Sequence, residues 1–339
     1  MIDLRSDTVT KPTPGMRKAM AEAEVGDDVF KEDPTVNAFQ KKISERFGME
    51  AGLFVPSGTM GNQLALNLLT RPCDEVITDK LSHLFNYESA AAGLISSVQL
   101  HTLESENGIL DAGRIRLGVR NKNDWDPRTS VIALENSANK GGGTCYSREA
   151  LLDIRKMAEV ENLYVHLDGA RIWNAALATD TDLEFFGKTA DTLSVCFSKG
   201  LGAPVGSMLL GSKELISRGY RMRKVLGGGM RQVGILAAAA EYAVDNHYPL
   251  LAEDHRRARQ LADVIGELDP FEIDPEAVVT NIVLFDVKNG STDPVLAELA
   301  GHGIHMVPFG PRTIRATFHF EVGDRDLESL LQIFRELYG

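Results

Sequence analysis

Residues 163–171 read Leu-Tyr-Val-His-Leu-Asp-Gly-Ala-Arg, an apolar run that ends in an acid, a tight turn and an arginine. Residues 193–202 read Leu-Ser-Val-Cys-Phe-Ser-Lys-Gly-Leu-Gly, so a lysine follows a second apolar run directly. Both runs have the length and composition of buried strands in a parallel sheet. Ligands bind at the carboxyl ends of strands in open α/β sheets, so Asp168 and Lys199 lie where chemistry is expected.

Helix-like and strand-like patterns alternate along most of the chain, which favours a largely parallel sheet covered by helices and an α/β fold class. We expect strands at residues 52–56, 74–78, 130–135, 163–168, 192–197, 278–285 and 313–319. We expect helices at residues 35–47, 60–69, 293–301 and 324–338, and one or two long helices within 236–265.

The chain has 339 residues, more than one hydrophobic core usually serves. Tyr248 and Pro249 interrupt a helical pattern, and beyond Pro270 the strands become short. We therefore predict an N-terminal arm (1–12) that packs elsewhere, a large domain (13–249) and a small C-terminal domain (250–339).

The composition excludes several classes of protein. A net charge of -12 argues against nucleic-acid and anionic-membrane partners. Cys73, Cys145 and Cys196 form no CxxC pair, and the eight histidines show no ligand spacing, so neither a disulfide framework nor a metal site is expected. Cys196 reads as a buried apolar residue. The chain lacks a signal peptide and an apolar run of about 20 residues, which predicts a cytoplasmic protein.

Three segments carry candidate chemistry. Lys199 lies between an apolar strand and glycines, which suits an imine-forming nucleophile, although a single loop lysine is more often solvated. An Asp at the end of a strand is more often a turn or cap residue than a functional one. Asp168, however, precedes Lys199 by about one strand–helix–strand unit, so the two side chains are expected to converge. Residues 57–63, Ser-Gly-Thr-Met-Gly-Asn-Gln, open a helix with free N–H groups and form an anion site or a simple capped turn.

These parts match the needs of pyridoxal 5′-phosphate (PLP): a lysine for an imine, a carboxylate against the pyridine nitrogen and a phosphate cradle. Eight segments, three of which overlap those quoted above, carry a resemblance; they are residues 4–13, 26–29, 32–34, 54–62, 82–83, 166–171, 198–207 and 226–232. In these segments the chain resembles the L-threonine aldolases, fold-type I PLP enzymes of the aspartate aminotransferase superfamily. The resemblance implies a mainly parallel seven-stranded sheet in the large domain and a small C-terminal α/β domain.

The resemblance also implies roles around the cofactor. Lys199 carries PLP, Asp168 pairs with the pyridine nitrogen, and His83 stacks on the ring near the substrate. Arg231 contributes from a neighbouring subunit, so a homodimer or homotetramer is expected. The phosphate is held by Ser57, Gly58 and Thr59. Taken without the family, His83 reads as a core histidine.

The resemblance places Ser6, Arg171 and Arg315 on the carboxylate of an amino-acid substrate, with Arg171 also beside the cofactor. A guanidinium binds a carboxylate at two points and fixes its orientation. Without the family, Arg315 reads as a surface ion-pair partner. In this group the Cα–Cβ bond of a β-hydroxy amino acid is broken, which yields glycine and an aldehyde.

Departures from the family bear on the reaction. Ala138 replaces the histidine that approaches the β-hydroxyl, Phe30 replaces a tyrosine, and Lys31 replaces a glycine. Three interpretations compete. His83 or a water supplies the base; the pocket accepts a bulkier substrate such as phenylserine; or the chain catalyses transaldolation, racemisation or β-elimination. A non-catalytic PLP-binding protein is a further alternative. If the missing base limits the rate, Ala138→His should raise threonine cleavage.

Overall fold

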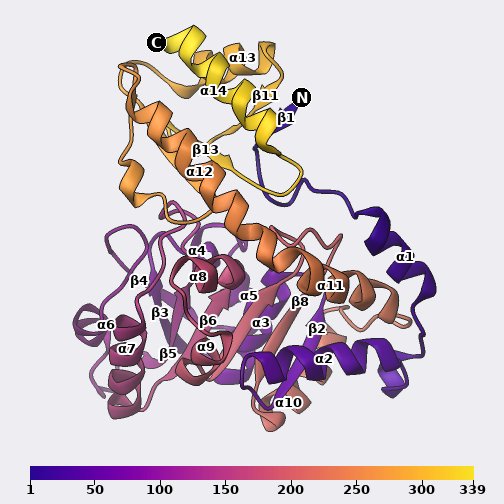
Figure 1. Cartoon of the computed structure of the whole chain (residues 1–339). Coiled ribbons are helices and arrows are strands. Elements are labelled where there is room, and N and C mark those ends of the chain that lie inside the picture. The colour runs from indigo at the N-terminus through magenta and orange to yellow at the C-terminus, as the bar shows by residue number, and fades with distance from the viewer.

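A seven-stranded sheet lies at the centre of the larger body of the molecule (Figure 1). The structure, a computed structural model, describes residues 1–339. Neighbouring strands are parallel except for β8, which runs antiparallel to both neighbours. In spatial order the strands are β2 (Ala51–Val55), β8 (Ser207–Gly211), β7 (Thr192–Cys196), β6 (Tyr164–Gly169), β5 (Arg128–Glu135), β3 (Asp74–Asp79) and β4 (Gln99–Leu103).

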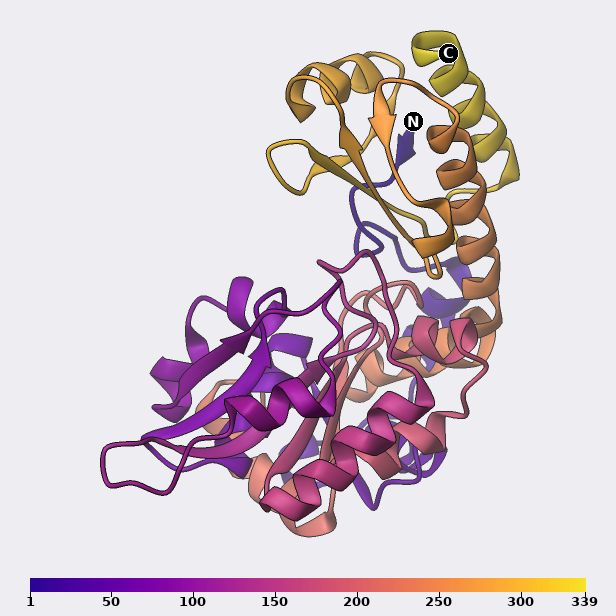
Figure 2. The same ribbon diagram turned by 90° about the vertical axis from the view of Figure 1, so that its left-hand side faces the viewer.

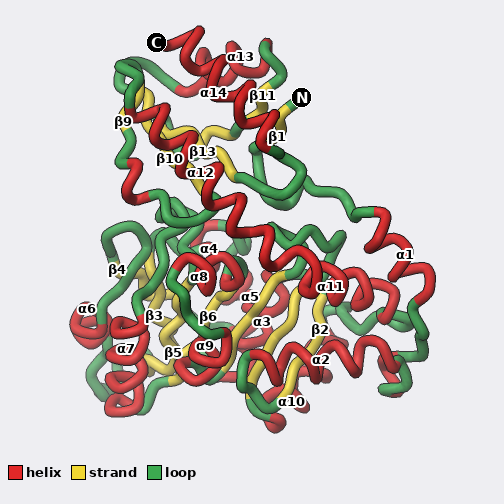
Figure 3. Tube along the Cα trace, in the orientation of Figure 1, coloured by secondary structure: helices red, strands yellow, loops and turns green.

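Both faces of this sheet are buried, except along the edge strand β4. Along β5, Ile132 and Leu134 join one apolar cluster with helices α2, α7, α8 and α11, whereas Val131 and Ala133 join a second cluster with α3. A strand buried on both faces reads as a continuous apolar run, which explains why this one was predicted correctly. Helices cover the sheet on both sides (Figure 3).

Several helices of this body begin at a residue whose side chain caps the first turn. In α2, Pro34 occupies the first turn and the Asp33 carboxylate accepts a hydrogen bond from the Val36 N–H at 3.0 Å. The helices are α1 (Pro14–Glu22), α2 (Pro34–Arg46), α3 (Gly58–Leu69), α4 (His83–Asn86), α5 (Ala91–Ser96), α6 (Ala112–Gly118), α7 (Arg148–Glu161), α8 (Ile172–Ala178), α9 (Leu183–Thr189), α10 (Lys213–Val225) and α11 (Gly234–His247).

The smaller body has its own apolar cluster, built around Phe271, Phe285 and Phe334. Its four-stranded antiparallel sheet has the order β12 (Val307–Pro308), β13 (Thr313–Thr317), β10 (Ile282–Val287) and β9 (Phe271–Glu272). Its helices are α12 (Leu251–Gly266), α13 (Thr292–Gly301) and α14 (Asp324–Tyr338).

Two segments join the bodies. Helix α12 runs from the large body into the small one, as Figures 1 and 2 show. The N-terminal strand β1 (Ile2–Asp3) pairs in parallel with β11 (Ile304–His305) of the small body. We propose the predicted division into domains at 249/250, because a short 3-10 turn, Tyr248–Leu250, separates α11 from α12 there.

Most predicted elements are confirmed, with differences at their ends and in strand number. The strand expected over 278–285 begins only at Ile282, because the Thr280 hydroxyl donates to the Gly143 carbonyl at 3.0 Å and ties this stretch to the large body. Strands β4 and β8 and the two-residue strands β1, β9, β11 and β12 were not predicted from the sequence. Cys196 is buried, as predicted. None of the helices is both long and apolar enough to cross a membrane.

Candidate functional site

A cavity of about 410 Å³ lies where the large and small bodies and the N-terminal segment meet. Five residues predicted from the sequence lie in its wall: Ser6, His83, Arg171, Lys199 and Arg315. The rest of the wall consists of Thr8, Tyr87, Asn139, Val307, Pro308 and Phe309. Residues far apart in the sequence therefore converge at the carboxyl end of the large sheet, as expected for this fold class.

Lys199 is positioned by a tight turn after β7. Its carbonyl accepts a hydrogen bond from the Gly202 N–H at 2.7 Å, and Gly202 has φ +80°, which favours glycine. A Cβ on Gly200 would lie 2.8 Å from Leu251 Cδ2, so α12 packs directly against this turn. The glycines after Lys199 are thus required by backbone geometry and close packing.

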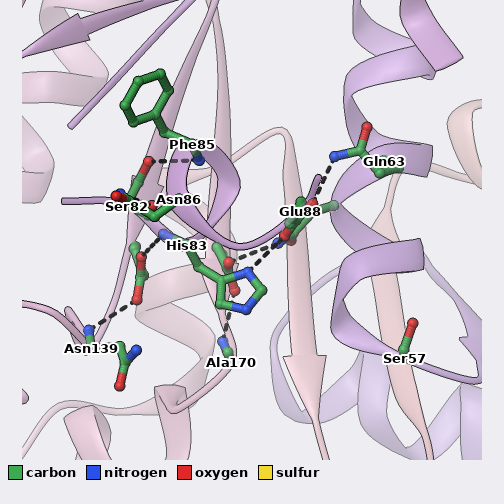
Figure 4. Close-up of polar contacts among 12 residues, drawn as sticks. Ser57, Gln63, Ser82, His83, Phe85, Asn86, Glu88, Asn139 and Ala170 are labelled. Carbon is green, nitrogen blue, oxygen red and sulfur yellow. Dashed lines mark hydrogen bonds and ion pairs between the residues drawn. The ribbon is translucent and has the colours of Figure 1, made fainter. Parts of the chain in front are cut away.

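His83 is the first residue of α4. The Ser82 hydroxyl caps this helix by accepting from the Phe85 N–H, and the His83 N–H donates to Glu135 Oε2 at 2.6 Å (Figure 4). The ring Nδ1 lies 2.9 Å from Glu88 Oε1. Burial disfavours the imidazolium, but the Glu88 hydrogen bond and the Asp168 charge outweigh it and raise the pKa of His83.

Asp168 lies near the end of β6, behind His83. Its Oδ2 accepts from Asn62 Nδ2 at 2.7 Å, and its Oδ1 accepts from the Ala170 N–H at 3.1 Å. Side-chain atoms of Asp168, His83 and Glu88 lie within 4.8 Å of one another. Asp168 itself is buried and does not line the cavity. Asp168 thus lies next to His83, which lines the same cavity as Lys199.

Two arginines converge on one amide. Arg171 Nη1 and Arg315 Nη1 both donate to Asn139 Oδ1, at 3.3 and 3.0 Å. Arg171 also forms a buried ion pair with Asp7, whereas the remaining hydrogen bond of Arg315 goes to the Arg5 carbonyl. Arg315 Nε is buried without a partner. Burial and the charge of Arg171 lower the pKa of Arg315 to about 10. This corner therefore favours an added carboxylate.

The predicted phosphate segment opens α3. The Ser57 hydroxyl accepts from the Met60 N–H at 3.2 Å, which makes Ser57 the cap, while the amides of Gly58 and Thr59 belong to the first turn, where helices leave N–H groups free. A Cβ on Gly58 would lie 2.8 Å from Cys196 Sγ, at the end of β7. The start of α3 therefore lies beside the strand that leads to Lys199.

The residues present fit PLP. Lys199 lines the cavity, and the buried Asp168 lies next to the cavity-lining His83. Helix α3 begins with Gly58, which has no side chain, beside the end of β7. Lys199 would hold the aldehyde carbon, Asp168 would face the pyridine nitrogen, and Gly58 and Thr59 would receive the phosphate.

Ala138 does not line the cavity. The Ala138 side chain is buried, and a Cβ added to Gly108 would lie 2.7 Å from the Cβ of Ala138. A Cβ on Gly141 would lie 3.2 Å from the same atom. The turn around Gly108 therefore packs directly against Ala138. The alanine in place of the family histidine removes a base, and it also leaves room for this turn. That packing revises the expectation that Ala138→His restores activity.

The other departures lie outside the cavity wall. Phe30 is 69% exposed, and Lys31 Nζ lies 4.9 Å from the centre of the Tyr220 ring. Arg231 pairs with Asp27 at 2.9 Å, and its side chain is 53% exposed. Within the chain the Arg231 guanidinium is therefore paired with a carboxylate, and its role at the phosphate stays a prediction.

Sequence reasoning missed four residues that organise the site: Asp7, Asn62, Glu88 and Asn139. Asp7, Asn62 and Asn139 lie inside or beside quoted segments, next to residues that were assigned, but nothing local distinguishes them. Glu88 lies in Tyr-Glu-Ser-Ala, which carries no recognisable signal. Their roles come from contacts between distant segments.

Comparison with solved structures defines the class. A serine palmitoyltransferase from S. paucimobilis with bound PLP superposes with a TM-score of 0.75 over 99% of this chain and 86% of its own, at 16% identity. A Leishmania major threonine aldolase gives a TM-score of 0.85 over 99% of both chains at 18% identity. The fold is that of the fold-type I PLP-dependent enzymes.

Sequence comparison is more specific. The Beta-eliminating lyase family matches residues 3–289. Low-specificity L-threonine aldolase 1 of Arabidopsis thaliana is 37% identical over 345 residues, which cover 99% of this chain and 96% of the plant protein. The low specificity L-threonine aldolase of Escherichia coli K12 is 41% identical over 268 residues, 79% of this chain and 80% of that protein. The chain belongs to the Beta-eliminating lyase family of PLP-dependent lyases.

Proposed function

We propose that this protein is a PLP-dependent aldolase that cleaves L-threonine, L-allo-threonine or a related β-hydroxy-α-amino acid into glycine and an aldehyde. The observation that carries the proposal is the cavity in which Lys199 and His83 share a wall with Arg171 and Arg315. An α-amino acid needs two adjacent sites: a cofactor that reacts with its amino group, and cationic side chains that bind its carboxylate. Relatives of nearly full length that are named threonine aldolases support the reaction.

PLP, when held on Lys199, supplies the electron sink for the bond broken at Cα. The side chains of this protein provide the orientation. Arg315, with its unpartnered Nε, and Nη1 of Arg171 grip the substrate carboxylate, and Ser6 lies in the same wall. His83 offers Nε2, which makes no hydrogen bond within the chain, to the β-hydroxyl proton directly or through a water.

Product analysis tests the proposal. Purified protein with added PLP is incubated with L-threonine, L-allo-threonine or L-phenylserine, and glycine and aldehyde are quantified. We expect equal amounts of both products from at least one substrate. Racemised substrate, release of ammonia, or exchange of aldehydes onto glycine without net cleavage would instead assign one of the other Cα reactions. No turnover and no PLP binding would favour a non-catalytic protein.

We further propose a homodimer or homotetramer in which Arg231 reaches the cofactor phosphate of a neighbouring subunit. The support is that Arg231 follows three glycines, is half-exposed and lies outside the cavity of its own chain. The Phe30 ring, 69% exposed close to the Asp27–Arg231 pair, is an apolar group that a partner subunit would cover.

A further inference from the structure

Glu88, between α4 and α5, has an unusual environment for a charged side chain. Its carboxylate is fully buried, although the flanking Tyr87 is 46% exposed. It accepts hydrogen bonds from His83 Nδ1 at 2.9 Å and from Gln63 Nε2 at 2.6 Å (Figure 4). A third hydrogen bond comes from Asn62 Nδ2 at 2.8 Å. The only ionisable group that pairs with it is His83. A buried carboxylate is costly without such partners.

The direction of each hydrogen bond follows from the chemistry. Asn62 directs its NH₂ group at both Glu88 and Asp168, and its Oδ1 lies 3.1 Å from His166 Nε2. A flipped amide would place its oxygen against two carboxylates, so only this orientation is consistent. Burial lowers the pKa of His166 to about 4, so this ring is neutral, and its Nε2–H is the donor.

One chain of hydrogen bonds therefore runs across the back of the site. His83 and Asp168, the two residues expected to flank the cofactor ring, lie at its ends. Glu88 and Asn62 connect them, and every donor points toward a carboxylate. The tautomer of a histidine is set by the partner of its other nitrogen. A carboxylate on Nδ1 thus leaves Nε2 of His83 as the acceptor toward the cavity.

We propose that Glu88 is a positioning residue that fixes the His83 ring with Nδ1–H bound and Nε2 toward the cavity, and that couples this ring to Asp168 through Asn62. The role rests on the proposed function, in which His83 serves the β-hydroxyl and Asp168 serves the cofactor nitrogen. Glu88 acts through His83 and is not itself placed against substrate.

Four charged groups act on the His83 ring. Glu88 and Asp168 stabilise the protonated ring, whereas the charge of Lys199 destabilises it. Glu135 accepts a hydrogen bond from the backbone N–H of His83. Glu88→Gln keeps the size of the side chain but removes one negative charge and places an NH₂ group among three donors. Burial then weighs more heavily against the imidazolium, so His83 should lose its proton at lower pH.

The test is ¹⁵N NMR of the histidine rings in the PLP-loaded protein. His83→Gln assigns the His83 signals, and Glu75→Gln is the matched control, because Glu75 is an equally buried glutamate paired with Arg120 away from the cavity. We expect neutral His83 as the Nδ1–H tautomer. We expect its pKa to fall by about 1–3 in Glu88→Gln and to stay unchanged in Glu75→Gln. The acid limb of kcat/KM should move to lower pH by the same amount.

Two results would overturn the role of Glu88: a neutral His83 ring in the Nε2–H tautomer, or the same His83 pKa in Glu88→Gln as in the parent protein. The tautomer is read in the parent protein, so it decides the matter even if Glu88→Gln does not fold. Absence of aldehyde formation, together with the expected NMR result, would instead reject the aldolase reaction and retain the contact.

Discussion

The Arg171 guanidinium and the Asp7 carboxylate meet at two points, Nε to Oδ2 at 2.8 Å and Nη2 to Oδ1 at 2.7 Å. Both side chains are buried. Asp7 belongs to the N-terminal segment and Arg171 to the start of α8, so this pair ties the segment to the carboxyl end of the sheet. The third nitrogen of Arg171, Nη1, donates to Asn139, whereas Arg315 forms no ion pair and its Nε has no partner, which leaves Arg315 as the freer of the two arginines.

Asp7→Asn should destabilise the protein by about 3–5 kcal/mol, because it leaves the buried Arg171 charge without its partner. Urea unfolding of the PLP-loaded protein measures this loss. Asp27→Asn is the control: Asp27 pairs with the half-exposed Arg231, so its loss should cost less than about 1 kcal/mol. Equal stability of Asp7→Asn and the parent would refute the assignment.

The same pair predicts a dependence on pH. Burial opposes the charge on Asp7, but Arg171 and Lys199 lower its pKa from 3.8 to about 2. A depressed folded-state pKa gives stability that is present above the unfolded value and lost as the pH falls through the folded value. The stability difference between the parent and Asp7→Asn should therefore shrink between about pH 4 and about pH 2. A constant difference over this range would contradict the prediction.

Arg315→Ala should raise KM for the amino acid by about 10–100-fold, because a charged hydrogen-bond donor to the carboxylate is lost. Steady-state kinetics with saturating PLP measures this, and kcat should change less than KM. The exposed Arg312 offers the control: Arg312→Ala should leave both constants unchanged. An unchanged KM in Arg315→Ala would place the carboxylate elsewhere.

The elements that could be predicted from the sequence are those with a local pattern of apolar residues. Strands β5, β6 and β7 carry apolar residues on both of their buried faces, and Lys199 and Asp168 follow from their places at strand ends. Strand β4 was missed because its residues are exposed or half-buried and lack an apolar run.

The contacts that organise the site were not predictable in this way. Asp7 reaches Arg171 across 164 residues of sequence, and Asn62 reaches Asp168 across 106. No periodicity encodes such pairs, because they depend on how the segments pack. The family resemblance supplied the roles of His83, Arg231 and Arg315, which their local sequence alone did not support.

Ala138→His should destabilise the protein by about 1–3 kcal/mol and should not accelerate threonine cleavage, because the turn at Gly108 occupies the space that an imidazole needs. Thermal unfolding and acetaldehyde formation are measured together. Ala138→Ser, which adds a single oxygen, serves as the control for a small change at this position. Faster cleavage by a fully stable Ala138→His variant would show that the turn yields and that the missing base limits the rate.

Mixed subunits test the proposed position of Arg231. Lys199→Ala and Arg231→Ala should each lack most activity alone. If Arg231 serves the neighbouring site, subunits refolded or exchanged together should regain activity, because one hybrid site combines an intact Lys199 with an intact Arg231. No recovery, in a mixture shown to contain hybrids, would place Arg231 outside the site or within its own subunit.

The most direct test of the account is to locate the cofactor covalently. The PLP-loaded protein is treated with borohydride, which fixes the cofactor to the amine that holds it, and the peptides are mapped by mass spectrometry. We predict the pyridoxyl group on Lys199, and none in Lys199→Ala. A label on another lysine, such as Lys140, whose Nζ lies 5.8 Å from the centre of the Tyr87 ring, or no label on PLP-saturated protein, would contradict the assignment of Lys199 as the residue that holds the cofactor.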